Sequence, residues 1–191
     1  IPKKSELLLQ TPQSFHARFH IDVRVNSEAI SVDPAAKAVT VHNRKTGEDY
    51  TETYDKLILS PGAAPTLPPI EGVGNERVFT LRNVPDAVRI KDYVEEEFPE
   101  SAVVVGGGYI GVEMAENLKK SGLDVTIVEM GDHLIAPLDY DMACDVHHYI
   151  KSQGIDLLLN RGAQAITEEG DKLCVRLPDR ELKTDLVILS V

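Results

Sequence analysis

The chain has 191 residues, of which 42% are hydrophobic and 27% charged, an ordinary composition for a globular protein. Its net charge of −11 argues against a nucleic-acid partner, and no apolar stretch reaches the ~20 residues that cross a bilayer. The first residues lack the layout of a signal peptide, and the two cysteines show no metal-ligand spacing. We therefore expect a cytoplasmic protein without a nucleic-acid or membrane partner.

The first part of the chain predicts one short helix and then strands. Thr11, a capping residue, and Pro12 favour a helix over 12–19. Alternating and β-branched residues predict strands, with a hairpin turn at Gly47, over 21–25, 29–32, 38–42, 50–54 and 57–59. The segment 61–74 holds four prolines and three glycines, so it predicts a linker, and we place a domain boundary between residues 75 and 76.

The remaining residues alternate between strand and helix patterns, which predicts an α/β, Rossmann-like, doubly wound domain. Strands are expected at 78–81, 103–105, 124–128, 155–159 and 186–189, and helices at 84–98, 109–121 and 139–153. Three short strands at about 163–168, 172–177 and 180–183 predict an antiparallel β-meander. The helical spacing predicts apolar stripes formed by Ala87, Ile90, Val94 and Phe98, and by Met142, Val146 and Ile150.

A glycine-rich turn joins the apolar strand at 103–105 to the next helix. Gly106 permits the tight turn, Gly108 lets the backbone approach a pyrophosphate, and Gly111 lets the helix pack close to the strand. The first N–H groups of that helix and its positive dipole end point at the phosphates. The sequence therefore predicts a dinucleotide site comprising Gly106, Gly108, Tyr109, Ile110 and Gly111.

An acidic residue follows the next strand, at the position that binds the adenosine ribose in dinucleotide sites. Glu129 lies 18 residues after Gly111, and Met130 stands beside it. A carboxylate there accepts hydrogen bonds from both hydroxyls of the adenosine ribose and repels a 2′-phosphate. We therefore predict that Glu129 and Met130 belong to a site for NAD(H).

A second signature, YDKLILSPGAAP, covers residues 54–65. Together with the glycine turn, it resembles the FAD-dependent pyridine nucleotide-disulfide oxidoreductase family. The variant Ser60-Pro61-Gly62, where the family usually has Ala-Thr-Gly, resembles the single-cysteine branch of coenzyme A-disulfide reductases, NADH oxidases and NADH peroxidases. Residues 7–15 resemble the segment that follows the redox cysteine in this branch, so the resemblance covers essentially the whole chain.

The resemblance implies two domains, a partial FAD-domain segment over 1–75 and an NAD(H)-binding domain over 76–191, truncated at its last strand. Ser60, Pro61 and Gly62 would lie against the flavin nucleotide. Tyr109 would cover the flavin face and move aside for nicotinamide, and the alternative is that it packs on the sheet. Glu113 would hold the helix at the nicotinamide site, or is simply a partly exposed helix carboxylate.

The chain also departs from the family pattern. It has no N-terminal strand with its own glycine fingerprint, no cysteine before Leu7 and no initiator Met, and it stops inside an apolar run. We therefore expect a fragment, with the redox cysteine, the acceptor site and the dimerisation domain outside it. The fragment alone is expected to bind NADH without FAD and without activity.

The resemblance implies that the parent enzyme is a homodimer that passes hydride from NADH to FAD and on to a disulfide, peroxide or oxygen. Two alternatives remain open. One is a fragment of a ferredoxin, rubredoxin or nitrite reductase flavoprotein, and the other is a non-catalytic NAD-binding module.

Other potentially reactive residues are expected to be structural. Cys144 is flanked by acidic residues, and Cys174 lies on a predicted strand, so neither has the electropositive setting of a reactive thiolate. His16 and His20 have i,i+4 spacing but no third ligand, and Glu95–Glu97 suit a solvated helix face. No metal site and no catalytic residue are predicted.

Overall fold

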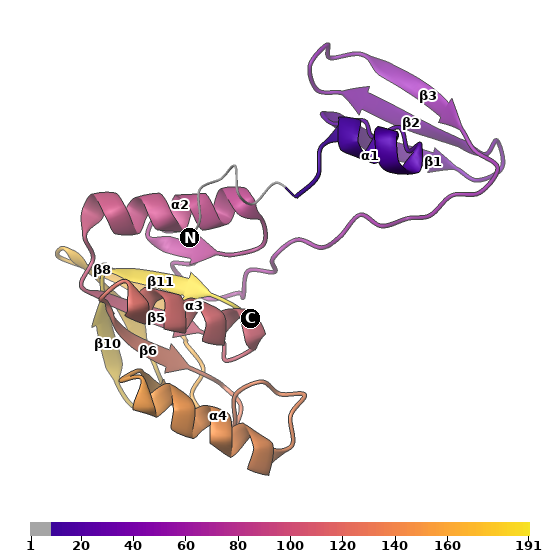
Figure 1. Cartoon of the computed structure of the whole chain (residues 1–191). Helices are drawn as coiled ribbons and strands as arrows, with labels where there is room; N and C mark the ends of the chain where they lie inside the picture. Colours follow the sequence, from indigo (N-terminus) through magenta and orange to yellow (C-terminus); the bar gives the residue numbers. More distant parts are fainter. Residues whose placement is uncertain (1–8) are drawn as a thin grey trace. The chain divides into compact units, whose positions relative to one another are not determined.

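The computed structural model describes residues 9–191, which divide into two compact units, 9–63 and 64–191 (Figure 1). Leu7 and Leu8, at the start of the segment that resembles the one after a redox cysteine, lie outside the described residues. The division falls inside the Gly/Pro-rich segment. Ile70 and Val73 pack against the core of the second unit, and the N–H of Ile166 donates to the carbonyl of Glu71 over 2.8 Å. No helix within 9–191 is long and apolar enough to cross a membrane.

The first unit combines one helix with a three-stranded antiparallel sheet. Helix α1 (Pro12–Phe19) begins at Thr11, whose side chain accepts from the N–H of Ser14 while its own N–H donates to the Ser14 hydroxyl. The sheet has the order β1-β2-β3 and is built from β1 (Ser27–Asp33), β2 (Ala38–Asn43) and β3 (Asp49–Thr53). None of residues 9–63 is fully buried.

Two strands expected in this unit do not form. Residues 21–25 and 57–59 are irregular, because no neighbouring strand within 9–63 offers them a hydrogen-bonding ladder. Ile58 and Leu59 are 89% and 72% exposed, so the apolar run at 57–59 is not a buried strand. The strand predictions for these two segments were therefore wrong.

The second unit is built on a five-stranded parallel sheet with the order β4-β11-β5-β6-β7. Its strands are β4 (Val78–Thr80), β5 (Ser101–Val105), β6 (Asp124–Val128), β7 (Asp156–Leu158) and β11 (Leu186–Leu189). The helices that alternate with them are α2 (Val84–Glu97), α3 (Tyr109–Lys120) and α4 (Tyr140–Ser152). A separate antiparallel meander is formed by β8 (Ala165–Glu169), β9 (Lys172–Arg176) and β10 (Glu181–Thr184). This confirms the predicted α/β, Rossmann-like fold with its meander.

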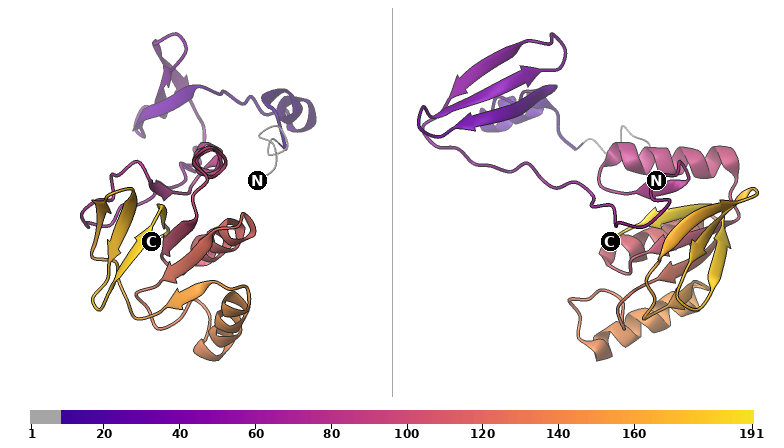
Figure 2. Two further views of the ribbon diagram at one scale, coloured as in Figure 1. Left: turned by 90° about the vertical axis from the view of Figure 1, so that its left-hand side faces the viewer. Right: turned by 180° about the vertical axis from the view of Figure 1, so that it is seen from behind.

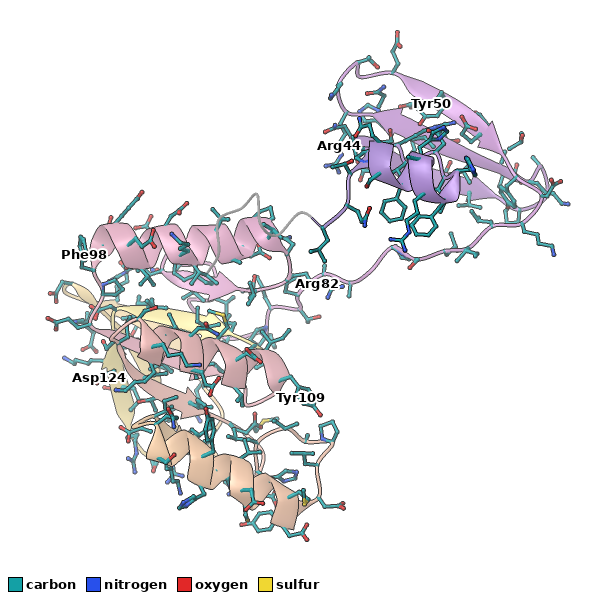
Figure 3. The ribbon with its side chains drawn as sticks, viewed as in Figure 1. Arg44, Tyr50, Arg82, Phe98, Tyr109 and Asp124 are labelled. Carbon is teal, nitrogen blue, oxygen red and sulfur yellow. The ribbon has the colours of Figure 1, made fainter. Side chains whose placement is uncertain are left out.

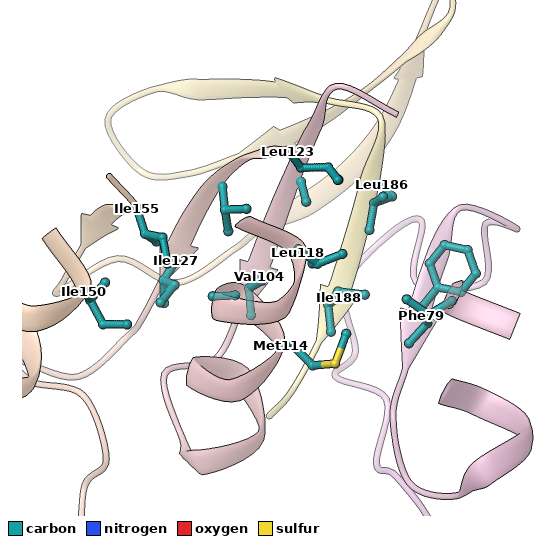
Figure 4. Close-up of a cluster of buried hydrophobic side chains, with 14 of the residues drawn as sticks. Phe79, Val104, Met114, Leu118, Leu123, Ile127, Ile150, Ile155, Leu186 and Ile188 are labelled. Atoms are coloured by element: carbon teal, nitrogen blue, oxygen red, sulfur yellow. The ribbon is translucent and has the colours of Figure 1, made fainter. Parts of the chain in front are cut away.

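The sheet is covered on both faces, which explains why its strands read as continuous apolar runs. Val104 of β5 points to the helices and joins a core with Met114, Leu118 and Ile150 (Figure 4), and Ala102 belongs to the same core. The alternate residues, Val103 and Val105, join a second core under the meander with Leu173 and Val175. Figure 2 shows the meander from behind, on the face of the sheet opposite α3 and α4.

Two residues of the predicted apolar stripes are exposed. Phe98 follows the end of α2 in a left-handed conformation (φ 49°) and is 79% exposed, because the helix stops before its side chain can reach the core. In α4 the buried residues are Ala143, His147 and Ile150, while Met142 is exposed. The buried stripe of α4 is therefore rotated from the predicted one and includes a histidine.

Asp185 connects the β10–β11 turn to the start of β5. Its Oδ2 accepts from the N–H groups of Glu100 (3.0 Å) and Ser101 (2.9 Å) and from the Ser101 hydroxyl (2.9 Å), and its Oδ1 lies 2.6 Å from Nζ of Lys172. Burial alone would raise the pKa of Asp185. The Lys172 ammonium and the Ser101 and Glu100 donors outweigh that effect and hold the pKa below its usual value.

Replacing Asp185 by alanine is expected to lower the free energy of unfolding by about 2–3 kcal/mol, because these donors lose their acceptor. The folded-state pKa lies below that of the unfolded chain, so this stabilisation is complete above about pH 4. It is lost as pH falls through the lower folded-state pKa. Urea unfolding at pH 7 and pH 3 is the measurement. Asp156→Ala, an exposed carboxylate on β7, is the control, and an equal loss in both variants would contradict the role of Asp185.

Candidate dinucleotide site

The glycines of the predicted turn lie where the structure leaves little room for a side chain. Gly106 has a φ of +107°, and a Cβ there would lie 2.3 Å from the carbonyl oxygen of Ser190. At Gly111 a Cβ would lie 2.0 Å from the carbonyl oxygen of Gly106, so this glycine lets α3 approach the end of β5. Gly108 differs, because no atom lies within 4 Å of its Cβ position. The backbone at Gly108 is therefore open to an approaching ligand.

Helix α3 begins without a capping side chain. Gly108 is its N-cap residue and offers no side-chain oxygen. The first N–H groups of α3, which include those of Tyr109 and Ile110, form the positive end of the helix dipole. Lys119 and Lys120 in the last turn complement the opposite end. The geometry is that of an anion-binding helix start.

Glu129 lies beside this turn, at the end of β6. Its Oε2 accepts the N–H of Gly107 and its Oε1 the N–H of Gly131, each over 2.6 Å. A carboxylate can accept about four hydrogen bonds in all, so each oxygen retains acceptor capacity. The two amides fix the orientation of the carboxylate, which can accept two further hydroxyl donors.

Met130, Tyr109 and Ile110 present their side chains to solvent. Met130 is 78% exposed, and a Cβ at Gly162 would contact its thioether at 3.8 Å. Tyr109 is 61% exposed at the start of α3 (Figure 3), so it does not pack beneath the sheet. Glu113, one turn further along α3, is also exposed. The structure thus brings together the eight predicted residues Gly106, Gly108, Tyr109, Ile110, Gly111, Glu113, Glu129 and Met130 in one βαβ segment.

The other three predicted residues, Ser60, Pro61 and Gly62, belong to the first unit. All three are exposed in an irregular segment, and Gly62 has a φ of +75°, a conformation that favours glycine. The left-handed φ of Gly62 agrees with the expected glycine position, but residues 57–68 form neither a regular turn nor the strand expected before it.

The loop that contains Leu134 and Ile135 contacts the glycine turn and was not predicted from the sequence. Ile135 donates its N–H to the carbonyl of Gly107 over 2.8 Å, and Leu134 donates its N–H to Nε2 of His147 over 3.0 Å. Gly107 is the residue that links this loop to Glu129. The apolar Leu134-Ile135 pair was a weak sequence signal, and nothing in the pattern of α4 singled out His147.

Both cysteines are free thiols. Cys174 is buried in β9, and burial, followed by the nearby carboxylates of Glu169 and Glu181, raises the pKa of its thiol. One ligand atom from each of these three residues lies within 4.8 Å of the others. The carboxylates already pair with Lys183 (3.1 Å) and Arg176 (3.6 Å), which neutralises the cluster. The thiol therefore stays protonated and is a poor nucleophile.

Comparison with known proteins agrees with this geometry. The model of the pyridine nucleotide-disulphide oxidoreductase family matches residues 3–191. An NADH oxidase of Methanocaldococcus jannaschii is 33% identical over 97% of this chain and 41% of its own length. A coenzyme A disulfide reductase of Staphylococcus aureus is 35% identical over 83% of this chain and 36% of its own length. The chain thus spans about two fifths of the curated relatives it matches.

Solved structures have a similar fold. Reduced Bacillus anthracis CoADR-RHD superposes with a TM-score of 0.91 and 44% identity, covering 99% of this chain and 34% of that one. The water-forming NADH oxidase of Lactobacillus brevis, bound to NADH, gives a TM-score of 0.88 and 27% identity over the whole chain and 42% of the oxidase. An engineered NADPH oxidase made from it, bound to NADPH, gives 0.88 and 26% with the same coverage.

Proposed function

This chain belongs to the pyridine nucleotide-disulphide oxidoreductase family, and from that premise we propose that residues 64–191 bind NADH. The observation that carries the proposal is the convergence of three features at one edge of the sheet. These are the open backbone at Gly108, the uncapped start of α3 and the oriented carboxylate of Glu129. They suit, respectively, the approach of a pyrophosphate, its negative charge and the two ribose hydroxyls.

The engineered NADPH oxidase supports the proposed role of Glu129 in recognising the ribose. Its five substitutions include a glycine, an aspartate eighteen positions later and both residues that follow that aspartate. Eighteen residues also separate Gly111 from Glu129 in this chain. The parent oxidase is described with NADH and the variant with NADPH. We therefore propose that an acid at this spacing determines the choice between the two nucleotides.

We further propose that the whole protein passes hydride from NADH to FAD and on to a disulfide, peroxide or oxygen. The names of the relatives support this proposal, and the cofactors supply the chemistry when bound. The part played by this chain is orientation. Tyr109 would cover the flavin face until nicotinamide enters, Glu113 would hold α3 at that site, and Ser60-Pro61-Gly62 would lie against the flavin nucleotide.

Residues 9–63 offer the flavin only the exposed segment at 60–62 and contain no fully buried residue, so most flavin contacts are proposed to come from other segments of the whole protein. The whole protein is proposed to be a cytoplasmic homodimer.

Calorimetric titration of the 191-residue chain tests the proposal. NADH is expected to bind, while the chain shows no flavin absorbance and does not consume NADH with coenzyme A disulfide, peroxide or air. In the whole protein, NADH is expected to bleach the flavin absorbance under anaerobic conditions. Tyr109→Ala is expected to change that rate without lowering Tm. A chain that fails to bind NADH would refute the nucleotide site, and a whole protein without flavin would favour a non-catalytic NAD-binding module.

A further inference from the structure

A buried histidine of α4 holds the loop that follows β6. His147 is 8% exposed, and its Nε2 accepts the N–H of Leu134 over 3.0 Å. Because an amide N–H donates to it, this nitrogen carries no proton, so the imidazole is neutral with its proton on Nδ1. Burial of the ring, and then the positive charges of Lys151 and His133, lower the pKa of His147 and favour this form.

The loop held by His147 is in an unfavourable conformation. Ile135, a β-branched residue, has a φ of +53°, where such side chains are rarely found. A residue in this region keeps its conformation only when the surrounding contacts fix it. Two contacts do so here. The N–H of Ile135 donates to the carbonyl of Gly107, and the preceding N–H donates to His147.

The same loop also packs against Gly107 in the glycine turn. The side chain of Leu134 is fully buried, and its Cδ2 lies 2.4 Å from where a Cβ of Gly107 would be. Gly107 in turn donates its N–H to the carboxylate of Glu129. A continuous set of contacts therefore runs from His147 through the loop and Gly107 to Glu129.

We infer that His147 is a positioning residue for the nucleotide, and that its neutral Nε2 holds Leu134 and Ile135 against Gly107 so that Glu129 keeps its orientation. The inference rests on the proposed binding of NADH. His147 does not touch the nucleotide in this scheme. A protonated ring has no acceptor nitrogen, so protonation releases the Leu134 amide and loosens the turn.

The groups around His147 determine how its protonation changes with pH. Lys151 lies on the same helix, and His133 and Asp132 face it from the loop. The ring of Tyr140 stands edge-on to both His133 (centroids 6.0 Å apart) and His147 (6.5 Å). Nδ1 of His133 lies 2.5 Å from Asp132, a contact that raises the pKa of His133. As pH falls, His133 therefore gains its proton first, and His147 follows at lower pH.

Two variants of similar size separate the hydrogen bond from packing. His147→Gln can still present an acceptor to Leu134, whereas His147→Leu fills the space without one. At pH 7.5, calorimetry on the 191-residue chain is expected to show NADH binding about tenfold weaker in His147→Leu. The glutamine variant is expected to bind within about threefold of the unmodified chain. His148→Leu, on the exposed side of α4, is the matched control and is expected to bind normally.

As pH falls and His147 gains its proton, the affinity of the unmodified chain for NADH is expected to fall more steeply than that of His147→Gln. Any slope that remains in the glutamine variant belongs to His133 or other groups. Equal affinities in the unmodified chain and His147→Leu, or equal losses in the leucine and glutamine variants, would overturn the inference. Should His147→Leu fail to fold, identical pH profiles of the unmodified chain and His147→Gln would overturn it.

An NMR measurement keeps the inference separate from the proposed function. The amide resonances of Leu134 and Gly107 are expected to shift on acid titration of the nucleotide-free chain, and to shift less in His147→Gln. A chain that binds no NADH but shows these shifts would refute the nucleotide site and retain the role of His147 in the turn. Amide resonances that do not respond would refute the role of His147.

Discussion

Gly106→Ala is expected to lower the free energy of unfolding of the chain by about 3 kcal/mol and to abolish NADH binding. Two effects add. A side chain at a φ of +107° is strained, and its Cβ would lie 2.3 Å from the backbone carbonyl of Ser190, which cannot move without displacing the end of β11. For a chain of this size the loss corresponds to a Tm lower by roughly 6–12 °C, measurable by circular dichroism.

Gly108→Ala is the matched control for this substitution. No atom lies within 4 Å of the Cβ position at Gly108, and its φ of −73° suits alanine, so Tm is expected to stay within about 2 °C of the unmodified chain. The added methyl group would nevertheless occupy space that the pyrophosphate approaches, so NADH is expected to bind at least about tenfold more weakly. An unchanged Tm in Gly106→Ala would show that Ser190 does not constrain the turn. Unchanged affinity in Gly108→Ala would remove that residue from the site.

The second large effect concerns the choice between NADH and NADPH. The unmodified chain is expected to bind NADPH at least about tenfold more weakly than NADH, because a 2′-phosphate would meet the carboxylate of Glu129. Glu129→Ala is expected to weaken NADH by about 1–3 kcal/mol through the loss of two ribose hydrogen bonds, and to narrow the difference between the nucleotides. Calorimetric titration with each nucleotide gives both quantities.

The control for Glu129→Ala is Glu96→Ala, which removes an exposed carboxylate of α2 and makes the same change in net charge. It is expected to leave both affinities unchanged. If the unmodified chain bound NADPH as tightly as NADH, Glu129 would have no part in discrimination. A loss of Tm in Glu129→Ala is expected as well, since the N–H groups of Gly107 and Gly131 lose their acceptor.

The glycine turn and the parallel sheet were predictable because their causes are local. Consecutive valines at 103–105 suit a strand covered on both faces, and each glycine of the turn has a steric reason that does not depend on distant residues. Glu129, which follows β6, is likewise identified by its spacing of 18 residues from Gly111. Gly106 and Gly111 therefore lie where their spacing predicted.

The missed features depend on contacts between distant segments. Residues 57–59 have the composition of a buried strand, but a strand also needs a neighbour, and residues 9–63 provide none for it. Hydrophobicity alone did not show that His147 is buried and Met142 exposed. The face that α4 buries is set by the loop it packs against. The left-handed Ile135 has no sequence signature, since its conformation is imposed by Gly107 and His147.

The position of β11 has a consequence for the order of events during synthesis. Among the described residues, β4 pairs with the sheet only through β11, which is translated about a hundred residues later. At bacterial or eukaryotic elongation rates this interval lasts roughly 5–20 s. During it, β5, β6 and β7 can assemble, while the apolar edge of β5 that β11 will occupy stays open. A nascent chain in this state exposes an unpaired strand edge, which is the kind of surface through which incompletely folded chains aggregate.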